Sequence, residues 1–244
     1  APHLGGRFRL AGEQPRRAQI LDLIAWYEVQ LQRLGVEVQL NQFMEARDIA
    51  TFDADSVIIA TGSLPDERGF QRALPHIDKL PGYTNGNVWS VEDIMGKAAR
   101  PSGHVIVLDD IGHWHGAGTA WHLAEQGCRV TIVTRFAMAA SELVRTATDW
   151  PLRQKLKQLG VETITDAAIT EWNGNGAEIV DLRDGETRRL DADGLVLACT
   201  NESQTWLADE LSNSGVSIDV IGDAIAPRLA VMAIYEGRKA AREL

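Results

Sequence analysis

Hydrophobic positions along the first third of the chain follow two different spacings, one typical of helices and one typical of strands. Between Gln14 and Leu34 the apolar residues recur at helical spacing, and Gly35 supplies a C-terminal stop. Residues 36–40 alternate between apolar and polar, as a half-buried strand does. Residues 55–62 form an apolar run that ends in small residues, which predicts a buried strand followed by a turn. Helices and strands therefore alternate, as in α/β proteins.

The remaining two thirds continue the alternation after a segment rich in Pro, Gly, Asn and Asp at residues 63–88, which we interpret as a crossover between domains. Ser90 can cap a short helix. The pattern then predicts a helix at 149–160, a strand at 161–165, a hairpin at 178–190, a buried strand at 194–200, a strand at 216–223 and a helix from 224 opened by Pro227.

Two apolar strands resemble each other in character and in context. Residues 56–62 and residues 194–200 each follow the tripeptide Asp-Ala-Asp, which stands at 53–55 and at 191–193. A repeated strand and turn suggests two related domains, each closed by the same element.

The stretch from Val105 to Arg135 reads as strand, Gly-rich turn, helix, strand, which is the βαβ unit of a dinucleotide-binding fold. In the intact fingerprint G-x-G-x-x-G, two glycines let the backbone approach a pyrophosphate and the third allows close helix packing. Here Gly116 takes the third position, while Ile111 and His113 replace the first two. Asp109 and Asp110 add negative charge just upstream, where the helix dipole would otherwise favour an anion. The sequence predicts the fold of this unit and leaves NAD(P)H binding open.

Composition narrows the functional classes. The chain has 244 residues and a formal net charge of −10, without a block of basic residues, which disfavours nucleic acid and anionic membranes as partners. No apolar run reaches the length of about 18 residues that a membrane span needs. The two cysteines, Cys128 and Cys199, lie far apart in apolar patterns, which predicts reduced, buried thiols in a cytoplasmic protein and excludes a C-x-x-C redox disulphide within this chain.

Several other side chains near the altered turn invite a chemical interpretation. Arg135 lies at the end of the second strand, the position at which such folds bind the 2′-phosphate of NADP. The favoured interpretation is nevertheless an exposed arginine at the end of a strand. Trp114 and Trp121 fit packing better than stacking on a ligand. The histidines do not match a zinc signature, so we expect no metal site among His113, His115 and His122.

A family resemblance rests on four segments in a fixed order: Leu4-Gly-Gly-Arg, Ala60-Thr-Gly62, the altered βαβ unit and Ile221-Gly-Asp-Ala-Ile-Ala-Pro-Arg228. Over essentially all of its length the chain resembles the C-terminal nucleotide-binding half of trimethylamine-dehydrogenase-like flavoproteins, which include histamine dehydrogenase, 2,4-dienoyl-CoA reductase and related demethylases. In that family an N-terminal old-yellow-enzyme barrel carries FMN and an iron–sulfur cluster. A domain that binds FAD or ADP follows, with an inserted domain of NAD(P)H-binding type.

The resemblance implies an α/β fold of two Rossmann-like, three-layer domains. Residues 1–85 and 209–244 would form a partial FAD- or ADP-binding domain that lacks its N-terminal βαβ unit, and residues 86–208 an inserted NAD(P)-binding-like domain. We therefore expect the chain to be a fragment whose partner is the N-terminal barrel of the same protein. Unpaired strand edges in such a fragment favour homo-oligomers.

The resemblance also implies cofactor-binding residues in this chain. Gly5 and Gly6 would lie near the adenosine end of FAD or ADP. Three residues would line the dinucleotide cleft: Ala60, Thr61 and Gly62.

A second group of implied residues lies near the C-terminus. Gly222 and Asp223 would approach the middle of the cofactor. Backbone N–H groups at a helix start can also hold a phosphate, and an Asp carboxylate can accept a hydrogen bond from a sugar or ribityl hydroxyl. For Arg228 two interpretations are equally supported. It could contact a cofactor phosphate or the flavin-bearing barrel, or it could be a solvated arginine.

No G-x-S-x-G, H-E-x-x-H or G-x-x-x-x-G-K-[ST] motif occurs, so redox chemistry is the best-supported class. The main hypothesis is the nucleotide-binding portion of an NADH:flavin-type oxidoreductase, an amine dehydrogenase, demethylase or enoyl reductase. It would relay or support electron transfer to the FMN barrel, with no catalytic residue of its own and no activity alone. The alternative is a non-catalytic module that binds ADP or supports oligomerisation. Substrate, the choice between FAD and ADP, and oligomeric state stay open.

Overall fold

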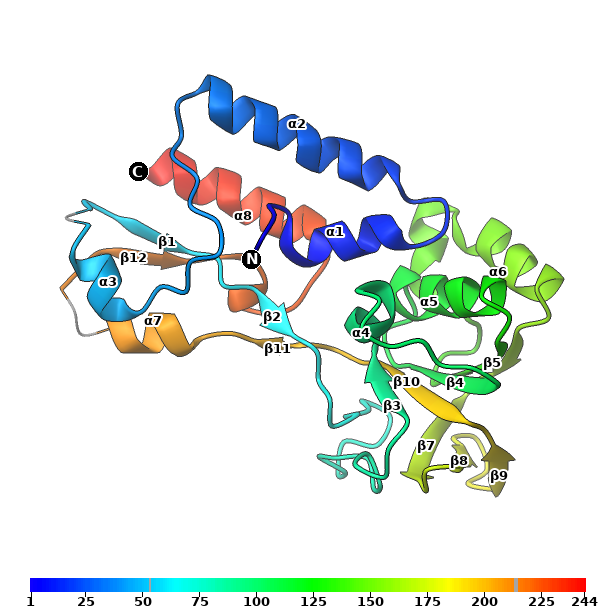
Figure 1. Ribbon diagram of the computed structural model, residues 1–244. Coiled ribbons are helices and arrows are strands. Elements are labelled where there is room, and N and C mark those ends of the chain that lie inside the picture. The colour runs from blue at the N-terminus through cyan, green and yellow to red at the C-terminus, as the bar shows by residue number, and fades with distance from the viewer. Residues whose placement is uncertain (53, 213–214) are drawn as a thin grey trace. The chain divides into compact units, whose positions relative to one another are not determined.

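The computed structural model describes residues 1–52, 54–212 and 215–244 (Figure 1). They form two compact units: unit 1 comprises residues 1–8, 26–64 and 201–244, and unit 2 comprises residues 9–25 and 65–200. Helices α1 (Gly6–Glu13) and α2 (Gln19–Arg33) contribute residues to both units. The predicted mixed α/β class is confirmed. Within these ranges no helix combines the length and the apolar character that a bilayer crossing demands.

Unit 2 is built around a five-stranded parallel sheet with the order β3-β10-β4-β5-β6. Its central strand β4 (His104–Asp109) and the neighbours β5 and β10 are buried on both faces, which explains their continuous apolar runs. The other strands are β3 (Val88–Ser90), β5 (Arg129–Thr134), β6 (Glu162–Ile164) and β10 (Gly194–Ala198).

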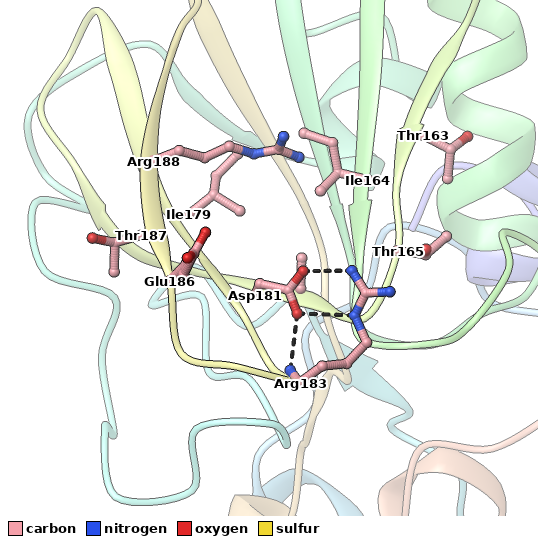
Figure 2. Close-up of a pocket in the computed structure, with 10 residues that line it drawn as sticks. Thr163, Ile164, Thr165, Ile179, Asp181, Arg183, Glu186, Thr187 and Arg188 are labelled. Atoms are coloured by element: carbon pink, nitrogen blue, oxygen red, sulfur yellow. Dashed lines mark hydrogen bonds and ion pairs between the residues drawn. The ribbon is translucent and has the colours of Figure 1, made fainter.

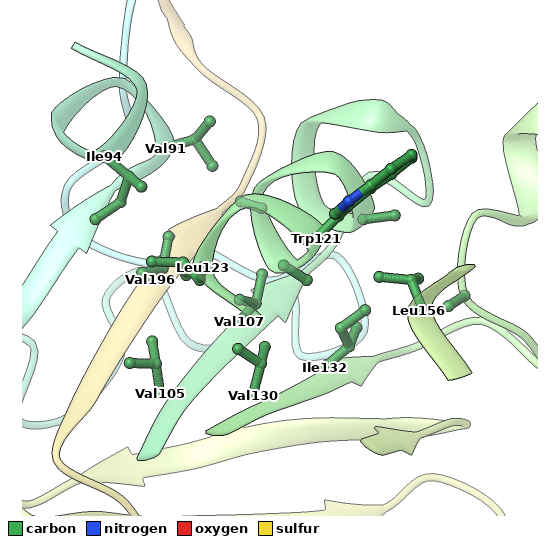
Figure 3. Close-up of a cluster of buried hydrophobic side chains, with 14 of the residues drawn as sticks. Val91, Ile94, Val105, Val107, Trp121, Leu123, Val130, Ile132, Leu156 and Val196 are labelled. Atoms are coloured by element: carbon green, nitrogen blue, oxygen red, sulfur yellow. The ribbon is translucent and has the colours of Figure 1, made fainter. Parts of the chain in front are cut away.

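Alternate side chains of these strands face opposite sides of the sheet, and each side is covered by a different layer. Val105, Val107 and Ile132 pack on one side with the helices α4 (Val91–Met95), α5 (Trp114–Glu125) and α6 (Asp149–Gln158) (Figure 3). Ile106 and Leu108 pack on the other side with an antiparallel sheet, which comprises β7 (Ala167–Trp172), β8 (Gly176–Asp181) and β9 (Thr187–Asp191). Unit 2 is therefore a three-layer sandwich of helices, parallel sheet and antiparallel sheet.

The predicted cap at Ser90 is confirmed. The Ser90 hydroxyl accepts a hydrogen bond from the Asp93 backbone N–H, and the Asp93 carboxylate accepts one from the Ser90 backbone N–H. This reciprocal capping box satisfies two backbone donors at the start of α4. A further short 3-10 helix, η1 (Ser141–Thr146), lies between β5 and α6.

Unit 1 has two short strand pairs. Strand β1 (Val57–Ile59) pairs in parallel with β12 (Ile218–Val220), and β2 (Ser63–Leu64) pairs antiparallel with β11 (Glu202–Ser203). Its small core comprises Ile59, Leu207 and Leu211 with partly buried neighbours. The helices of this unit, besides parts of α1 and α2, are α3 (Ala46–Ala50), α7 (Trp206–Leu211), the 3-10 helix η2 (Gly222–Ala224) and α8 (Ala230–Glu243).

The helix predicted between Gln14 and Leu34 is confirmed as α2, with its start at Gln19, and residues 6–13 form the separate helix α1. A second prediction at the beginning of the chain is wrong. The strand predicted at 36–40 is not a strand: the N–H of Val36 bonds to the Leu31 carbonyl behind it, and Val38 is 42 % exposed. Apolar alternation makes a strand only where a neighbouring strand supplies a hydrogen-bonding partner, and none of the described residues does so here.

Other predictions differ mainly in extent. The strand predicted at 55–62 is confined to β1, of which only Ile59 is buried, and β7 belongs to a segment for which no strand was predicted. The hairpin between β8 and β9 is confirmed. Helix α8 begins at Ala230 rather than at 224, because Leu229 keeps the extended conformation of an N-cap. The tripeptide at 53–55 begins with Asp53, which lies outside the described residues.

Candidate functional site

The carboxylate of Asp223 is the centre of a hydrogen-bonding cluster in unit 1. Its Oδ2 accepts a hydrogen bond from the Ser63 hydroxyl at 3.1 Å and lies 3.6 Å from the Arg7 guanidinium, which itself donates to Ser63 Oγ at 2.8 Å. Its Oδ1 accepts from the backbone N–H of Arg228 at 3.1 Å. The Asp223 carbonyl accepts from the Ser203 hydroxyl at 2.8 Å. Four segments of the chain, around Arg7, Ser63, Ser203 and Asp223 itself, therefore meet at Asp223, whose carboxylate is partly exposed.

The Ala60-Thr61-Gly62 turn lies directly after β1 and is held from the opposite strand segment. The Thr61 hydroxyl donates to the Gln204 carbonyl at 2.6 Å, and the Gln204 N–H donates to the Gly62 carbonyl at 2.9 Å. Gly62 has a φ of +78°, a conformation that L side chains rarely adopt, and no atom lies within 4 Å of the place where a Cβ would be. The turn thus presents bare backbone at an open surface.

Gly222 and Arg228 are both bound by Glu236 of α8. The Gly222 N–H donates to Glu236 Oε2 at 2.7 Å, and the Arg228 guanidinium pairs with Glu236 Oε1 at 2.7 Å. The Glu236 side chain is 16 % exposed, so this ion pair is partly shielded from solvent. Arg228 lies before α8, which begins at Ala230, and its guanidinium is held by Glu236 rather than fully solvated.

A largely apolar cavity of about 400 Å³ lies beside the Ala60-Thr61-Gly62 turn in unit 1. Phe43 and Trp206 form part of its wall and stack in parallel, with ring centroids 5.2 Å apart and an interplanar angle of 8°. Strand β1 and the first residues of the turn, Ala60 and Thr61, complete it. A flat aromatic ring is the kind of group that such walls accommodate.

The sequence-predicted residues are therefore partly brought together. Asp223 and Arg228 are joined through the Arg228 N–H, and Gly6 is next in sequence to Arg7, which contacts the cluster. Gly5 and Gly6 have φ angles of +96° and +46° and are exposed. Sequence reasoning missed three contributors that carry no motif of their own, namely Ser63, Ser203 and Glu236, and it assigned no role to Arg7, although Arg7 ends the Leu4-Gly-Gly-Arg segment.

The altered turn of unit 2 contains a buried carboxylate. Asp109 ends β4, and its Oδ1 accepts hydrogen bonds from the backbone N–H groups of Gly112 at 2.9 Å and Ile111 at 3.2 Å. Burial raises the pKa of Asp109 to about 6, although these two N–H groups oppose the shift. A Cβ on Gly116 would stand 2.6 Å from the Asp109 Cγ. The predicted role of Gly116 in close helix packing is thus confirmed.

Asp110 has a different environment, and the predicted repulsion by two carboxylates is wrong for it. Asp110 Oδ2 lies 2.7 Å from the Arg72 guanidinium and Oδ1 lies 3.3 Å from that of Arg135. The charge of this buried carboxylate is therefore balanced. The interpretation of Arg135 as a solvated arginine is also wrong, because its side chain is 29 % exposed, pairs with Asp110 and stacks over the Phe136 ring.

The remaining chemical candidates belong to the packing of unit 2. Trp121 is 8 % exposed within the helix-side core and lies 6.4 Å from the Trp114 ring, which confirms a packing role. Both cysteines are free and buried, as predicted. Burial also lowers the pKa of His113 at the N-cap of α5, which disfavours its cationic form.

A second cavity, of about 310 Å³, lies between β6 and the β8–β9 hairpin of unit 2, and Figure 2 shows its lining. The Arg183 guanidinium donates to both carboxylate oxygens of Asp181, at 3.0 and 2.6 Å, and these hydrogen bonds lower the pKa of Asp181 to about 2. With two basic and two acidic side chains, the wall is close to neutral in charge. None of the sequence-predicted residues lies there.

The parallel sheet with its strand-turn-helix-strand crossover and the separate Gly-Asp turn define a nucleotide-binding oxidoreductase module. The chain belongs to the pyridine nucleotide-disulphide oxidoreductase family, whose model matches residues 23–226. Its relatives are flavoproteins of the trimethylamine dehydrogenase and 2,4-dienoyl-CoA reductase type, as the resemblance implied.

Three relatives illustrate the range. NADH oxidase of Thermoanaerobacter brockii is 30 % identical over 244 residues, which cover 99 % of this chain and 36 % of that protein. A probable N-methylproline demethylase of Rhizobium meliloti is 34 % identical over 72 % of this chain and 24 % of its own length. The structure of 6-hydroxypseudooxynicotine amine oxidase from Pseudomonas geniculata superimposes with a TM-score of 0.92 at 29 % identity, over 98 % of this chain and 36 % of that one. The chain therefore spans about a third or less of these relatives.

Proposed function

We propose that this chain is the nucleotide-binding portion of a flavin-dependent oxidoreductase of the amine dehydrogenase, demethylase or enoyl reductase class. Residues 1–85 and 209–244 would bind FAD or ADP, and residues 86–208 would form an inserted domain of NAD(P)-binding type. The observation that carries the proposal is the convergence on Asp223 of the 60–63 turn, the 222–228 turn and the segment that follows Gly5 and Gly6.

The residues of unit 1 fit an adenine nucleotide. The apolar cavity with its stacked aromatic wall suits a flat base, and Gly62 leaves bare backbone beside it. The Asp223 carboxylate can accept a hydrogen bond from a ribose or ribityl hydroxyl. The Arg228 guanidinium pairs with Glu236, so its charge is balanced within the turn and the fit does not depend on it.

In the complete protein, we propose, an N-terminal barrel is the partner of this chain. Flavin on that barrel would supply the redox chemistry, and an iron–sulfur cluster there would carry electrons onward. The residues of the present chain would bind and orient the nucleotide and leave the reacting atoms to the barrel. The proposal includes location in the cytoplasm and assembly into a homo-oligomer.

The experiment begins with the coding sequence upstream of Ala1, from which the complete polypeptide is expressed. We expect purified protein to release an adenine nucleotide on acid treatment, identified by chromatography and mass spectrometry. Release of FAD, with flavin absorbance beyond that of FMN, supports a relay, whereas release of ADP supports a non-catalytic nucleotide module. The altered turn of unit 2 favours a non-catalytic role for the inserted domain.

A matched pair of variants ties the nucleotide to the site. Asp223→Asn removes the charge at the centre of the cluster, and we expect bound nucleotide to fall about tenfold, the size of effect of a lost charge-assisted hydrogen bond. Asp219→Asn makes the same change at an exposed position of β12 and should leave occupancy unchanged. Complete protein without an adenine nucleotide, or equal occupancy in the two variants, contradicts the proposal.

A further inference from the structure

The family description implies a pyridine nucleotide, and the turn before α5 is where the fold would hold its pyrophosphate. Such a site needs free backbone N–H groups at the helix start and glycines that let the phosphates approach the backbone. It also needs space without side chains and, for NADP, a free cation near the end of the second strand. Each requirement can be compared with the residues that form this turn.

Two backbone donors of the turn, those just before the helix start, are already used. The N–H groups of Ile111 and Gly112 both point at Asp109 Oδ1, so an internal carboxylate receives the hydrogen bonds that a phosphate would take. The Asp109 side chain is fully buried, and Gly116 in the first turn of α5 leaves just enough room for it. A phosphate that approached this helix start would meet a like charge in a region of low dielectric constant.

Gly112, which lies between the two replaced glycine positions, does not open the turn. It has a φ of +71°, as a tight turn requires, but a Cβ there would lie 2.7 Å from both the Phe136 ring and the Ser141 hydroxyl. The space on that side of the backbone is filled by these side chains. The positions that should be bare carry Ile111 and His113.

Two arginines at the sheet edge are also already engaged in ion pairs. Arg72 and Arg135 both pair with Asp110, whose side chain is 2 % exposed, and the Arg135 Nε also donates to the Asp110 carbonyl at 3.3 Å. Separating either guanidinium would leave a buried carboxylate short of its partner, which is costly. No free cation for a 2′-phosphate is therefore present at the end of β5 in the described part of unit 2.

We infer that the Asp109 carboxylate occupies the anion site of this turn, so that unit 2 binds neither NADH nor NADPH there. The residues do not fit the dinucleotide that the family description implies. Combined with the proposed function, on which this one consequence rests, the inference means that hydride from a nicotinamide does not enter the protein through unit 2. Electrons would then come from the organic substrate of the barrel, as in a dehydrogenase, or from a donor that binds elsewhere.

The test measures binding at the turn directly, through the backbone amides of the wild-type 244-residue chain. The amide resonances of Ile111 and Gly112 are assigned by NMR, and NADH, NADPH and ADP are each titrated to millimolar concentration. We expect these two amides to stay unshifted with all three nucleotides. Saturable shifts of both amides with NADH or NADPH would overturn the inference.

A variant pair covers the case in which calorimetry detects binding of NADH somewhere in the chain. Asp109→Asn keeps the shape of the side chain and removes its charge, so a dinucleotide seated at this turn would bind about tenfold more tightly to the variant. That gain, absent from the control Asp184→Asn on the exposed β8–β9 connection, is what removal of the repelling charge predicts and supports the inference. Equal affinity in all three proteins places the binding elsewhere and also supports it, so that the amide shifts in the wild-type chain are the result that overturns the inference. A complete protein that lacks FAD and ADP would contradict the proposed function without affecting either result.

Discussion

The substitution Asp109→Asn offers a quantitative test of the buried carboxylate through folding stability. Asparagine has nearly the same shape, and its carbonyl oxygen can still accept the hydrogen bonds from Gly112 and Ile111. The substitution therefore removes the ionisation and little else. Among the described residues, Asp109 Oδ2 has no hydrogen-bond partner, so ionisation puts charge on an oxygen that nothing stabilises directly.

The sign follows from the direction of the pKa shift. The pKa of Asp109 rises from 3.8 to about 6 on folding, so the folded protein binds the proton more tightly than the unfolded chain does. The stability from this group is fully present below pH 3.8 and is lost as the pH rises through about 6. A shift of about 2 units at about 1.4 kcal/mol each gives a total loss of about 3 kcal/mol, of which about 2 kcal/mol falls between about pH 4.5 and about pH 7.5.

The assay is urea unfolding of wild type and variant at several pH values, with the free energy of unfolding compared at each. We expect Asp109→Asn to gain about 2 kcal/mol relative to wild type between about pH 4.5 and about pH 7.5. Any constant cost of burying the new amide group cancels in this difference. The same measurement on Asp184→Asn, at an exposed position, is the control for the general effect of removing one carboxylate. The reasoning would be refuted if the free energy of unfolding of Asp109→Asn relative to wild type did not change with pH, or if it fell as the pH rose.

The other predictions concern packing and capping, each measured as a change in the free energy of unfolding. Gly116→Ala should cost about 1–3 kcal/mol because its methyl group would overlap the strand-end carboxylate, whereas Gly237→Ala, whose methyl group meets only ordinary contacts in α8, should be neutral or stabilising. Ser90→Ala should cost about 1 kcal/mol through loss of the cap on α4. Trp172→Ala should cost about 3–5 kcal/mol because this side chain is fully buried, while Trp150→Ala at an exposed position should stay within about 0.5 kcal/mol. Equal effects within either matched pair, or no effect of Ser90→Ala, would contradict the packing and capping described here.

The two turns illustrate one physical theme in different ways. In unit 2, a carboxylate is satisfied by backbone N–H groups and fills the place of a ligand. In unit 1, Glu236 binds the Gly222 N–H and the Arg228 guanidinium together, while Asp223 stays partly exposed. The difference in exposure explains why we assign nucleotide binding to unit 1 and deny it to the turn of unit 2.

Local sequence patterns determined the elements whose partners are close in the chain. The βαβ unit from β4 to β5, the cap at Ser90, the hairpin of β8 and β9 and the tight contact at Gly116 were all predicted, because spacing, turn chemistry and residue size act over a few residues. The class and family of the protein also followed from the sequence, through its motifs and their order.

Long-range contacts were decided by the tertiary structure alone. Ser63 and Asp223 are 160 residues apart in sequence, and no pattern marks Arg7 or Glu236 as their neighbours. Residues 36–40 show the converse: their alternation is that of a strand, yet pairing needs a partner that periodicity cannot supply. The sequence also cannot distinguish the roles of Asp109 and Asp110, which are adjacent and chemically identical. Because one faces backbone N–H groups inside the turn and the other faces two arginines, only the folded chain distinguishes the carboxylate that fills the anion site from the one that is neutralised.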